Sequence, residues 1–218
     1  MAPLRYVYAV CRPLSAPLQL TGVSGAPARQ LEHHGLVAVV SQVPADADWR
    51  TMSRAHRNIV DALTGVTTPL PLRPGLVFPD DSAVRVMIEE REEEFRRALE
   101  RIEGRVEWNL RVSCDDVTGK RARAGAEEFA CRLHEILSGQ AEDSRAHAPA
   151  GTTSFGASEH SVLDAAYLVP RSRSEEFVER VDRAEGEVQG IQVELTGPWA
   201  VYSFTGLPDA AEGSRNPV

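Results

Sequence analysis

Hydrophobic residues along this chain follow two different periods, and the period predicts which segments are strands and which are helices. Near alternation with β-branched and aromatic residues predicts strands at Leu4–Cys11, Val106–Ser113 and Ile191–Leu195. Leu36–Val43 is apolar almost throughout, which is typical of a strand covered on both faces. A further strand is predicted at Val162–Val169.

Apolar residues spaced three and four apart predict four amphipathic helices. The first covers Ala47–Leu63, and its inward face consists of Trp49, Met52, His56, Ile59 and Leu63. The second follows the capping residues Asp80–Ser82 and ends at about Glu103. Its charged segment Glu89–Arg97 is interpreted as a solvated face in preference to a docking surface. The other two helices are predicted at Glu127–Leu137 and Ser174–Val188.

The segment Thr67–Asp81 separates the first two helices and contains four prolines. Proline fixes φ and lacks an N–H group, so no helix can run through this segment. Its leucines, with Val77 and Phe78, are too numerous for a solvated loop, and we predict an irregular extended strand over a core. Arg73 lies in its middle, where we favour a structural role over a functional one.

The order of these elements predicts an α+β protein of two domains with a boundary near Gly104. Residues 1–104 are expected to form an N-terminal α/β sandwich-like domain, in which Arg12–Arg29 is a loop or partial strand. Residues 105–207 have the order β–α–(β)–β–α–β, which is typical of a ferredoxin-like domain.

Three segments of the second half carry weaker signals. Thr118–Ala124 (TGKRARA) lacks a phosphate-loop pattern and is expected to be a strand-to-helix turn. Ser138–His160 is small and polar, so we predict a loop with a short strand near Ser144–Ala148. Residues 208–218 are predicted to be a disordered tail.

Composition and charge exclude several classes of protein. The chain carries a net charge of −8, which argues against a general nucleic-acid binder. No apolar run reaches the ~18–20 residues that span a bilayer, and the first residues lack a signal-peptide pattern, so we expect a cytoplasmic protein without a transmembrane segment. Cys11, Cys114 and Cys131 are far apart, so we expect free buried thiols in place of disulfides or a zinc site.

Candidate catalytic residues do not form a recognisable pattern, and the sequence contains none of the common nucleotide-binding or hydrolase motifs. His33 and His34 are adjacent, so they are expected to point apart and to make a poor chelate. His56 lies on an apolar helical face, where a half-buried structural histidine is the favoured interpretation. We therefore predict no catalytic, cofactor-binding or metal-binding residue. The alternative is a ligand-binding or enzymatic protein in which His56, Arg73 and Asp81 line a pocket between the domains.

Aromatic residues gather after the last predicted strand, at Trp199, Tyr202 and Phe204. Gly197-Pro198 interrupts regular pairing there, so a strand beyond it would be an edge strand. Closure of the core, with Trp199 folded over the end of the domain, is the favoured interpretation. The functional alternative is a sheet edge or aromatic patch that captures an apolar partner.

Three blocks of sequence carry a resemblance to a known family. They are RYVYAV with LVAVVSQVP in the first strands, PLPLRPGLVFPDD at Pro69–Asp81, and LDAAYLVPRSRSEEF with ELTGPWAVYSF near the C-terminus. In this order, over about Leu4 to Phe204, they resemble the gas vesicle protein L/F (GvpL/GvpF) family. The resemblance implies two α+β domains, the second with a modified ferredoxin-like fold, and a non-enzymatic role in gas vesicle assembly.

The resemblance also implies partners, namely the hydrophobic gas vesicle shell protein and other gas vesicle accessory proteins, and an association with gas vesicles in the cell. It implies no cofactor. The family pattern assigns no binding residue, and our own candidates for partner contacts are Arg73, Phe78, Trp199, Tyr202 and Phe204. A further possibility is a general scaffold that keeps the family's sequence in an organism without visible vesicles.

Overall fold

The computed structural model describes residues 3–114, 120–147 and 161–207, and the chain divides into two compact units. The first unit comprises the residues up to Glu103 together with those from Phe204 onward, and the second comprises Gly104–Ser203. The domain limits expected from the sequence, 1–104 and 105–207, remain predictions. The tail predicted at 208–218 lies outside the described residues.

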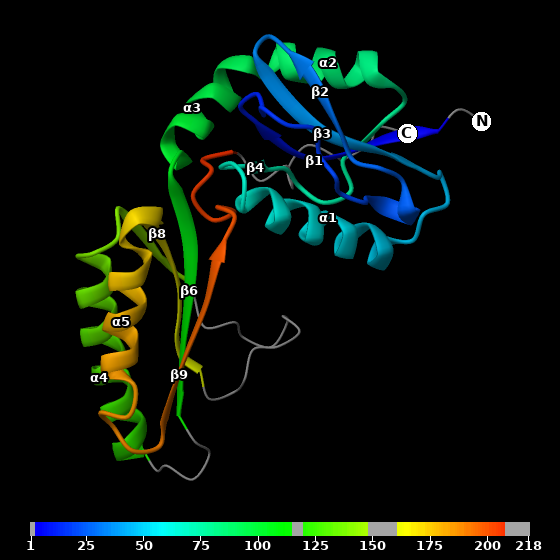
Figure 1. Ribbon diagram of the computed structural model, residues 1–218. Coiled ribbons are helices and arrows are strands. Elements are labelled where there is room, and N and C mark those ends of the chain that lie inside the picture. The colour runs from blue at the N-terminus through cyan, green and yellow to red at the C-terminus, as the bar shows by residue number, and fades with distance from the viewer. Residues whose placement is uncertain (1–2, 115–119, 148–160, 208–218) are drawn as a thin grey trace, which may run out of the picture. The chain divides into compact units, whose positions relative to one another are not determined.

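An antiparallel sheet of five strands forms the middle of the first unit (Figure 1). The strands are β1 (Leu4–Cys11), β2 (Arg29–His33), β3 (Leu36–Val43), β4 (Leu70–Pro71) and β5 (Val77–Phe78). Their order is β2-β3-β1-β4, and β5 pairs with β1 further along its length. The predicted bounds of β1 and β3 are confirmed, because both strands are buried on both faces and carry nearly unbroken apolar runs.

The sequence pattern did not predict strand β2, where only Leu31 is buried. The other four residues of RQLEH are polar, and all but the exposed Glu32 are half-buried, so no alternation of apolar and polar residues marks the strand. The turn to β3 is formed by His34 and Gly35 with φ values of 51° and 69°, the left-handed conformation that two-residue hairpins favour.

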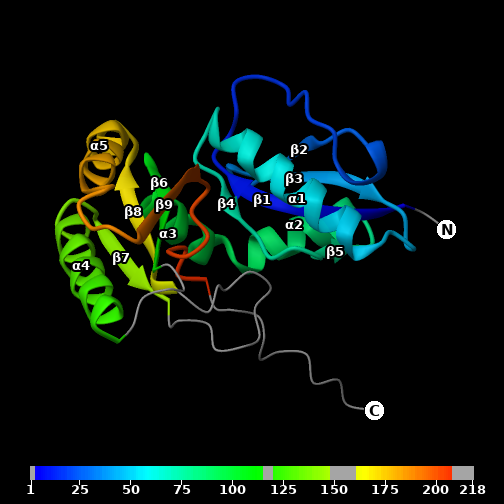
Figure 2. The same ribbon diagram turned by 90° about the horizontal axis from the view of Figure 1, so that it is seen from below.

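Helices cover both faces of this sheet. Helix α1 (Trp49–Thr64) packs on one face, and α2 (Asp81–Glu90) packs on the other (Figures 1 and 2). Side-chain caps begin both helices, because Asp48 accepts the N–H groups of Arg50 and Thr51, and Asp80 accepts that of Ala83. A short 3-10 helix, η1 (Val23–Gly25), precedes β2.

The single helix predicted to end at Glu103 is wrong, because the chain forms two helices there. Arg91, with φ −117° and ψ 18°, ends α2, and α3 (Glu92–Ile102) begins immediately after it. The Arg91 guanidinium donates two hydrogen bonds to Glu94, at 2.7 and 2.9 Å, and lies 4.7 Å from the centroid of the Phe95 ring. These contacts hold the break in place, and the apolar spacing alone does not reveal it.

A buried polar contact joins η1 to the sheet. The Tyr8 hydroxyl accepts the Val23 N–H at 2.9 Å and lies 2.7 Å from the Ser41 hydroxyl oxygen. A Cβ at Gly22 would lie 2.3 Å from the Tyr8 hydroxyl oxygen and 2.6 Å from that of Ser41. Only glycine fits this position without displacing a fully buried side chain.

The second unit has the order of elements predicted for a ferredoxin-like domain. Its elements are β6 (Arg105–Cys114), α4 (Lys120–Ser138), β7 (Asp143–Ala146), β8 (Ser161–Pro170), the 3-10 helix η2 (Arg171–Arg173), α5 (Ser174–Ala184) and β9 (Ile191–Trp199). The strands form an antiparallel sheet in the order β7-β8-β6-β9, and α4 and α5 cover one of its faces (Figure 1). The predicted α+β class is thus confirmed.

Two details of the second unit differ from the sequence-based expectations. Helix α4 begins at Lys120, so Lys120–Ala124 is helical where a turn was expected, while Thr118 and Gly119 lie outside the described residues. Strand β9 continues through the cis peptide bond Gly197-Pro198 and ends at Trp199. A register shift opposite β6 accommodates this irregular part of the strand.

Residues that follow β9 are anchored on β6 through Glu107. This carboxylate is only 4% exposed and accepts the N–H groups of Tyr202 and Ser203, at 3.0 and 2.7 Å, and the Ser203 hydroxyl at 2.9 Å. A Cβ at Gly197 would lie 2.7 Å from the Trp108 ring, so close backbone approach requires glycine there. Neighbouring residues of β6 therefore fix the end of β9 and the segment after it.

Replacing Gly22 with alanine is expected to lower the free energy of unfolding by about 2 kcal/mol, because the new methyl group overpacks Tyr8 and Ser41. Gly125→Ala is the matched control, since a Cβ there would meet no other atom within 4 Å and alanine favours a helix. Urea denaturation followed by circular dichroism measures both. Equal midpoints for Gly22→Ala and the unchanged protein would contradict this packing.

Glu107→Gln is expected to lower the free energy of unfolding by about 2 kcal/mol, because two N–H groups and a hydroxyl lose a charged acceptor. Glu187→Gln on an exposed position serves as the control and should leave stability unchanged. Urea denaturation again gives the measurement. If both variants unfold at the same midpoint, Glu107 does not anchor this segment.

Candidate interaction sites

Arg73 and Phe78 of the proline-rich segment differ in exposure. The Leu72 N–H donates to the Tyr8 carbonyl at 3.0 Å, and the Val7 N–H donates to the Leu76 carbonyl at 3.0 Å. The predicted extended strand thus lies along β1 as two short pieces, and residues 73–75 bulge between them. Arg73 is exposed in this bulge, whereas Phe78 is half-buried in β5.

Trp49 contradicts the expectation that it faces the core. It is 58% exposed, and a Cβ at Gly75 would lie 2.9 Å from its ring. Trp49 begins α1, so the bulge at residues 73–75 and not the sheet lies beneath its ring. The helical spacing was correct for the later turns of α1, where Ile59 and Leu63 are buried.

His56 is fully buried at 1% exposure, deeper than the half-buried position predicted. The Tyr6 hydroxyl accepts the Gly75 N–H at 3.0 Å and lies 3.2 Å from His56 Nδ1. Burial lowers the pKa of His56 to about 4, partly offset by the backbone of Leu72. The imidazole is therefore a neutral part of the core.

Asp81, the third residue of the alternative site, is held by two arginines. Its Oδ1 accepts hydrogen bonds from Arg5 at 2.6 Å and from Arg29 at 2.5 Å. Partial burial raises the Asp81 pKa and the two arginines lower it, with a net lowering. These bonds tie α2 to β1 and β2. Since Asp81 and His56 both have partners inside the first unit, neither is placed as an acid or base with a substrate-facing proton.

His33 and His34 do not point apart as predicted. Their rings stack with centroids 4.2 Å apart, because the left-handed backbone of His34 turns both side chains to one side. His34 Nδ1 lies 2.7 Å from a Glu92 carboxylate oxygen, and His33 Nε2 lies 3.8 Å from Glu89. The hydrogen bonds from His34 and then Arg96 lower the pKa of Glu92. The charged segment at the α2–α3 break is thus largely occupied by contacts within the first unit.

The three C-terminal aromatic residues have different environments. Trp199 is 37% exposed, and its indole N–H donates to the Thr196 hydroxyl at 3.3 Å; Tyr202 is 40% exposed. Phe204 is fully buried and belongs to the first unit, so its side chain offers no surface to a partner. Trp199 does not close the core as expected, because Val201 and Phe204 are the residues that the fold buries.

Metal ligation and membrane insertion have no support in the described part of the chain. No group of three or more histidine, cysteine or acidic residues there could hold a metal ion. No helix within the described ranges is long and apolar enough to cross a membrane. The three cysteines are free, as predicted, but Cys131 is exposed and not buried.

The buried His56 is expected to make stability depend on pH. Its pKa is lower in the folded chain, about 4, than the 6.5 of an unperturbed histidine, so the unfolded chain binds more protons between these values. Stability from this residue is complete above about pH 6.5 and is lost progressively down to about pH 4, by roughly 3 kcal/mol in total.

Urea denaturation at several pH values measures this loss in the unchanged protein and in His56→Gln. The variant should lose less stability between pH 6.5 and 4.5, because no ring is left to protonate. His147→Gln, at an exposed histidine, is the control and should follow the unchanged protein. Parallel curves for His56→Gln and the unchanged protein would rule out the proposed protonation.

Comparisons with known proteins agree on one family. The family described as gas vesicle synthesis protein GvpL/GvpF matches residues 4–123 and 118–206. Gas vesicle protein L of Streptomyces sp. (strain CB03234) is 40% identical, with 94% of each chain covered. Gas vesicle protein F of the same strain is 25% identical, with 91% of this chain and 98% of the relative covered.

A solved structure supports the same fold. The crystal structure of gas vesicle protein GvpF from Microcystis aeruginosa superposes with a TM-score of 0.75 at 17% identity, over 94% of this chain and 100% of that chain. At this identity the similarity establishes the fold alone. The family match and the 40% identical relative both extend over nearly the whole chain, and they establish the family as well as the fold. The resemblance found in the sequence is confirmed: the chain belongs to the gas vesicle synthesis protein GvpL/GvpF family.

Proposed function

We propose that this chain is an accessory protein of gas vesicle assembly that binds the hydrophobic shell protein and keeps it from aggregating before it is incorporated. The observation that carries the proposal is the family match over residues 4–123 and 118–206. Other gas vesicle accessory proteins are proposed as additional partners. No specific observation favours an enzymatic function, since His56 is a neutral core residue and Asp81 is held by two arginines.

Physical chemistry is compatible with this role. A shell subunit that forms a water-repelling wall exposes apolar surface until it is assembled, and exposed apolar surface drives aggregation. A partner with a net charge of −8 would keep a complex of the two proteins in solution through repulsion between complexes.

The proposed contact for the shell protein is the edge of the second sheet at β9. This strand pairs with β6 on one side, and no other described strand pairs with its opposite side. Backbone N–H and C=O groups at such an edge can pair with an added strand. Half-buried Ile191, Val193 and Leu195 alternate along the edge, and exposed Trp199 and Tyr202 stand at its end.

Arg73 and Phe78 are proposed as a separate and smaller contact. Arg73 is exposed in the bulge of the proline-rich segment, and arginine is frequent among residues that dominate binding energy. Phe78 is half-buried, so it supplies part of one ring face. Phe204 is left out of the proposed contacts because it is fully buried.

The test dilutes denatured gas vesicle shell protein into buffer with and without this chain and follows light scattering. The unchanged protein is expected to suppress scattering and to co-purify with the shell protein. Trp199→Ala and Tyr202→Ala are expected to weaken suppression by about tenfold in the concentration required, since exposed aromatic residues dominate such contacts. Trp49→Ala removes a comparably exposed aromatic residue from the first unit and should have little effect.

The outcomes distinguish whether the chain binds the shell protein from whether it does so through the β9 edge. Suppression that is equally strong in all three variants would retain shell-protein binding and remove β9 as its site. Absence of both suppression and co-purification in the unchanged protein would overturn the proposed function.

A further inference from the structure

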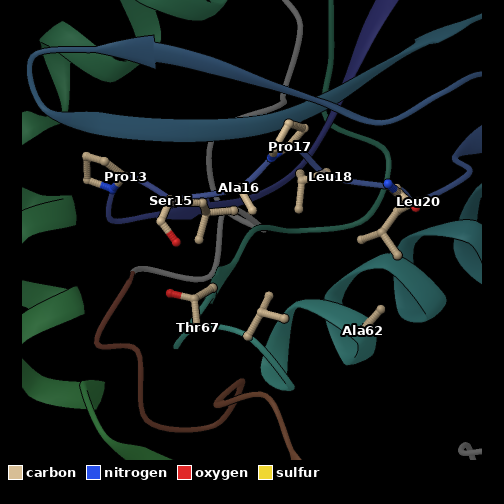
Figure 3. Close-up of a pocket in the computed structure, with 11 residues that line it drawn as sticks. Pro13, Ser15, Ala16, Pro17, Leu18, Leu20, Ala62 and Thr67 are labelled. Carbon is tan, nitrogen blue, oxygen red and sulfur yellow. The ribbon is translucent and has the colours of Figure 1, made fainter.

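An open groove lies between the end of α1 and the loop that follows β1 (Figure 3). Its volume is about 470 Å³, and none of its lining residues is charged. Pro13, Pro17 and Leu18 come from the loop, and Ala62 and Val66 come from α1 and the turn after it. Val66 is 71% exposed, the largest exposed fraction among the exposed large apolar residues of the described chain. The groove thus offers apolar surface that the fold itself leaves uncovered.

Local contacts hold both walls of the groove in place. The Gln30 side-chain amide donates to the Ala16 carbonyl at 2.7 Å, and the Ala28 N–H donates to the Leu20 carbonyl at 2.8 Å. On the other wall the Val66 N–H donates to the Leu63 carbonyl at 3.0 Å. Prolines further restrict the loop, so little conformational entropy is lost when the groove is filled.

Helix α1 carries a stripe of positive charge on its exposed face. Arg50, Arg54 and Arg57 recur at spacings of four and three, so they share one side of the helix, and all three are exposed. No described acidic residue lies within ion-pair distance of them, but Asp61, four residues after Arg57, and the capping Asp48 near Arg50 attract these two arginines. Asp61 is the only acidic residue within α1, so the helix is net positive in a chain of net charge −8.

The groove and the arginine stripe adjoin along the same helix. Arg50 and Ala62 are separated by about 18 Å at the 1.5 Å rise per residue of an α-helix. A helical segment of about twelve residues therefore covers both, with one apolar side toward the groove and charged residues toward the arginines. Guanidinium groups pair with carboxylates through two parallel hydrogen bonds, so carboxylates are the complementary charge.

We propose that this groove and the arginine stripe of α1 form one docking surface for an amphipathic segment of a partner protein that is apolar on one side and acidic on the other. Charge complementarity identifies the occupant, because an uncharged groove favours apolar side chains and the three exposed arginines of a net positive helix favour carboxylates. This inference rests on the proposed function, that the chain binds a protein partner, and adds a surface for that binding. It assigns a surface in the first unit that is separate from the β9 edge.

The first test measures binding of a fluorescent synthetic helical peptide with leucines on one face and glutamates on the other, by anisotropy. The acidic peptide should bind, and binding should weaken as salt is raised because exposed charges are screened. A peptide with lysine in place of each glutamate, and one with serine in place of each leucine, should bind at least about tenfold more weakly. Equal binding of the lysine peptide would overturn the role of charge, and equal binding of the serine peptide would overturn the role of the groove.

The second test uses paired variants of the intact chain. Val66→Asp should weaken binding of the acidic peptide by about tenfold or more, whereas Val86→Asp, at a 50% exposed valine of α2, should change it by less than about twofold. The double change Arg54→Glu with Arg57→Glu should weaken it similarly, and Arg183→Glu on α5 should not. Circular dichroism confirms that each variant is folded.

Further outcomes decide the remaining cases. Loss of binding in all variants alike, or in none of them, would overturn this docking surface. Anionic vesicles or a single-stranded oligonucleotide that bind more tightly than the acidic peptide would replace the protein partner with a membrane or a nucleic acid. Suppression of shell-protein aggregation is measured separately, so it can persist when the acidic peptide fails to bind, and failure of the docking surface is thereby distinguished from failure of the proposed function.

Discussion

Backbone hydrogen bonds along both edges of β1 position the rest of the first unit. β3 pairs with one edge over almost the whole strand, and the proline-rich segment pairs with the other edge in two short pieces. The side chains of β1 continue this role, because Tyr6 reaches α1 and the bulge while Tyr8 reaches η1 and β3. Each tyrosine hydroxyl is buried and satisfied, so movement of any one of these elements would leave a polar group unpaired.

Several charged residues of the first unit form ion pairs that connect its strands and helices. Asp81 binds arginines from β1 and β2, and Glu92 binds His34 and Arg96 at the start of α3. These carboxylates are committed to contacts within the fold. The three arginines of α1 differ, because they are exposed and outnumber Asp61, the one acidic residue of that helix, and no described carboxylate lies within ion-pair distance of them. This excess of positive charge distinguishes the proposed docking surface from the charged segment that α2 and α3 use within the fold.

In the second unit one buried carboxylate has a comparable effect. Glu107 lies on β6 and holds the backbone of Tyr202 and Ser203, while the ring of Trp108 packs on Gly197. The exposed positions of Trp199 and Tyr202 follow from these contacts, since Val201 is buried between them. The proposed shell-protein contact at the end of β9 therefore depends on a residue that is itself hidden from any partner.

The sequence by itself determined the class of fold, most of its elements and the family. Strands β1 and β3 and the later turns of α1 were predictable because burial imposes a period on apolar residues. The family was predictable because three stretches of sequence resemble it in the same order along the chain. β2, the break at Arg91 and the outward position of Trp49 were not, because each depends on neighbours distant in sequence and not on local spacing.

Only the tertiary structure decided the roles of the candidate residues. It buried Phe204 and His56, exposed Trp199, and placed Ala62 and Val66 opposite Pro13 and Leu18. Whether a side chain is covered, paired or open to a partner depends on which segments the fold brings together, and hydrophobic periodicity carries no information about that pairing.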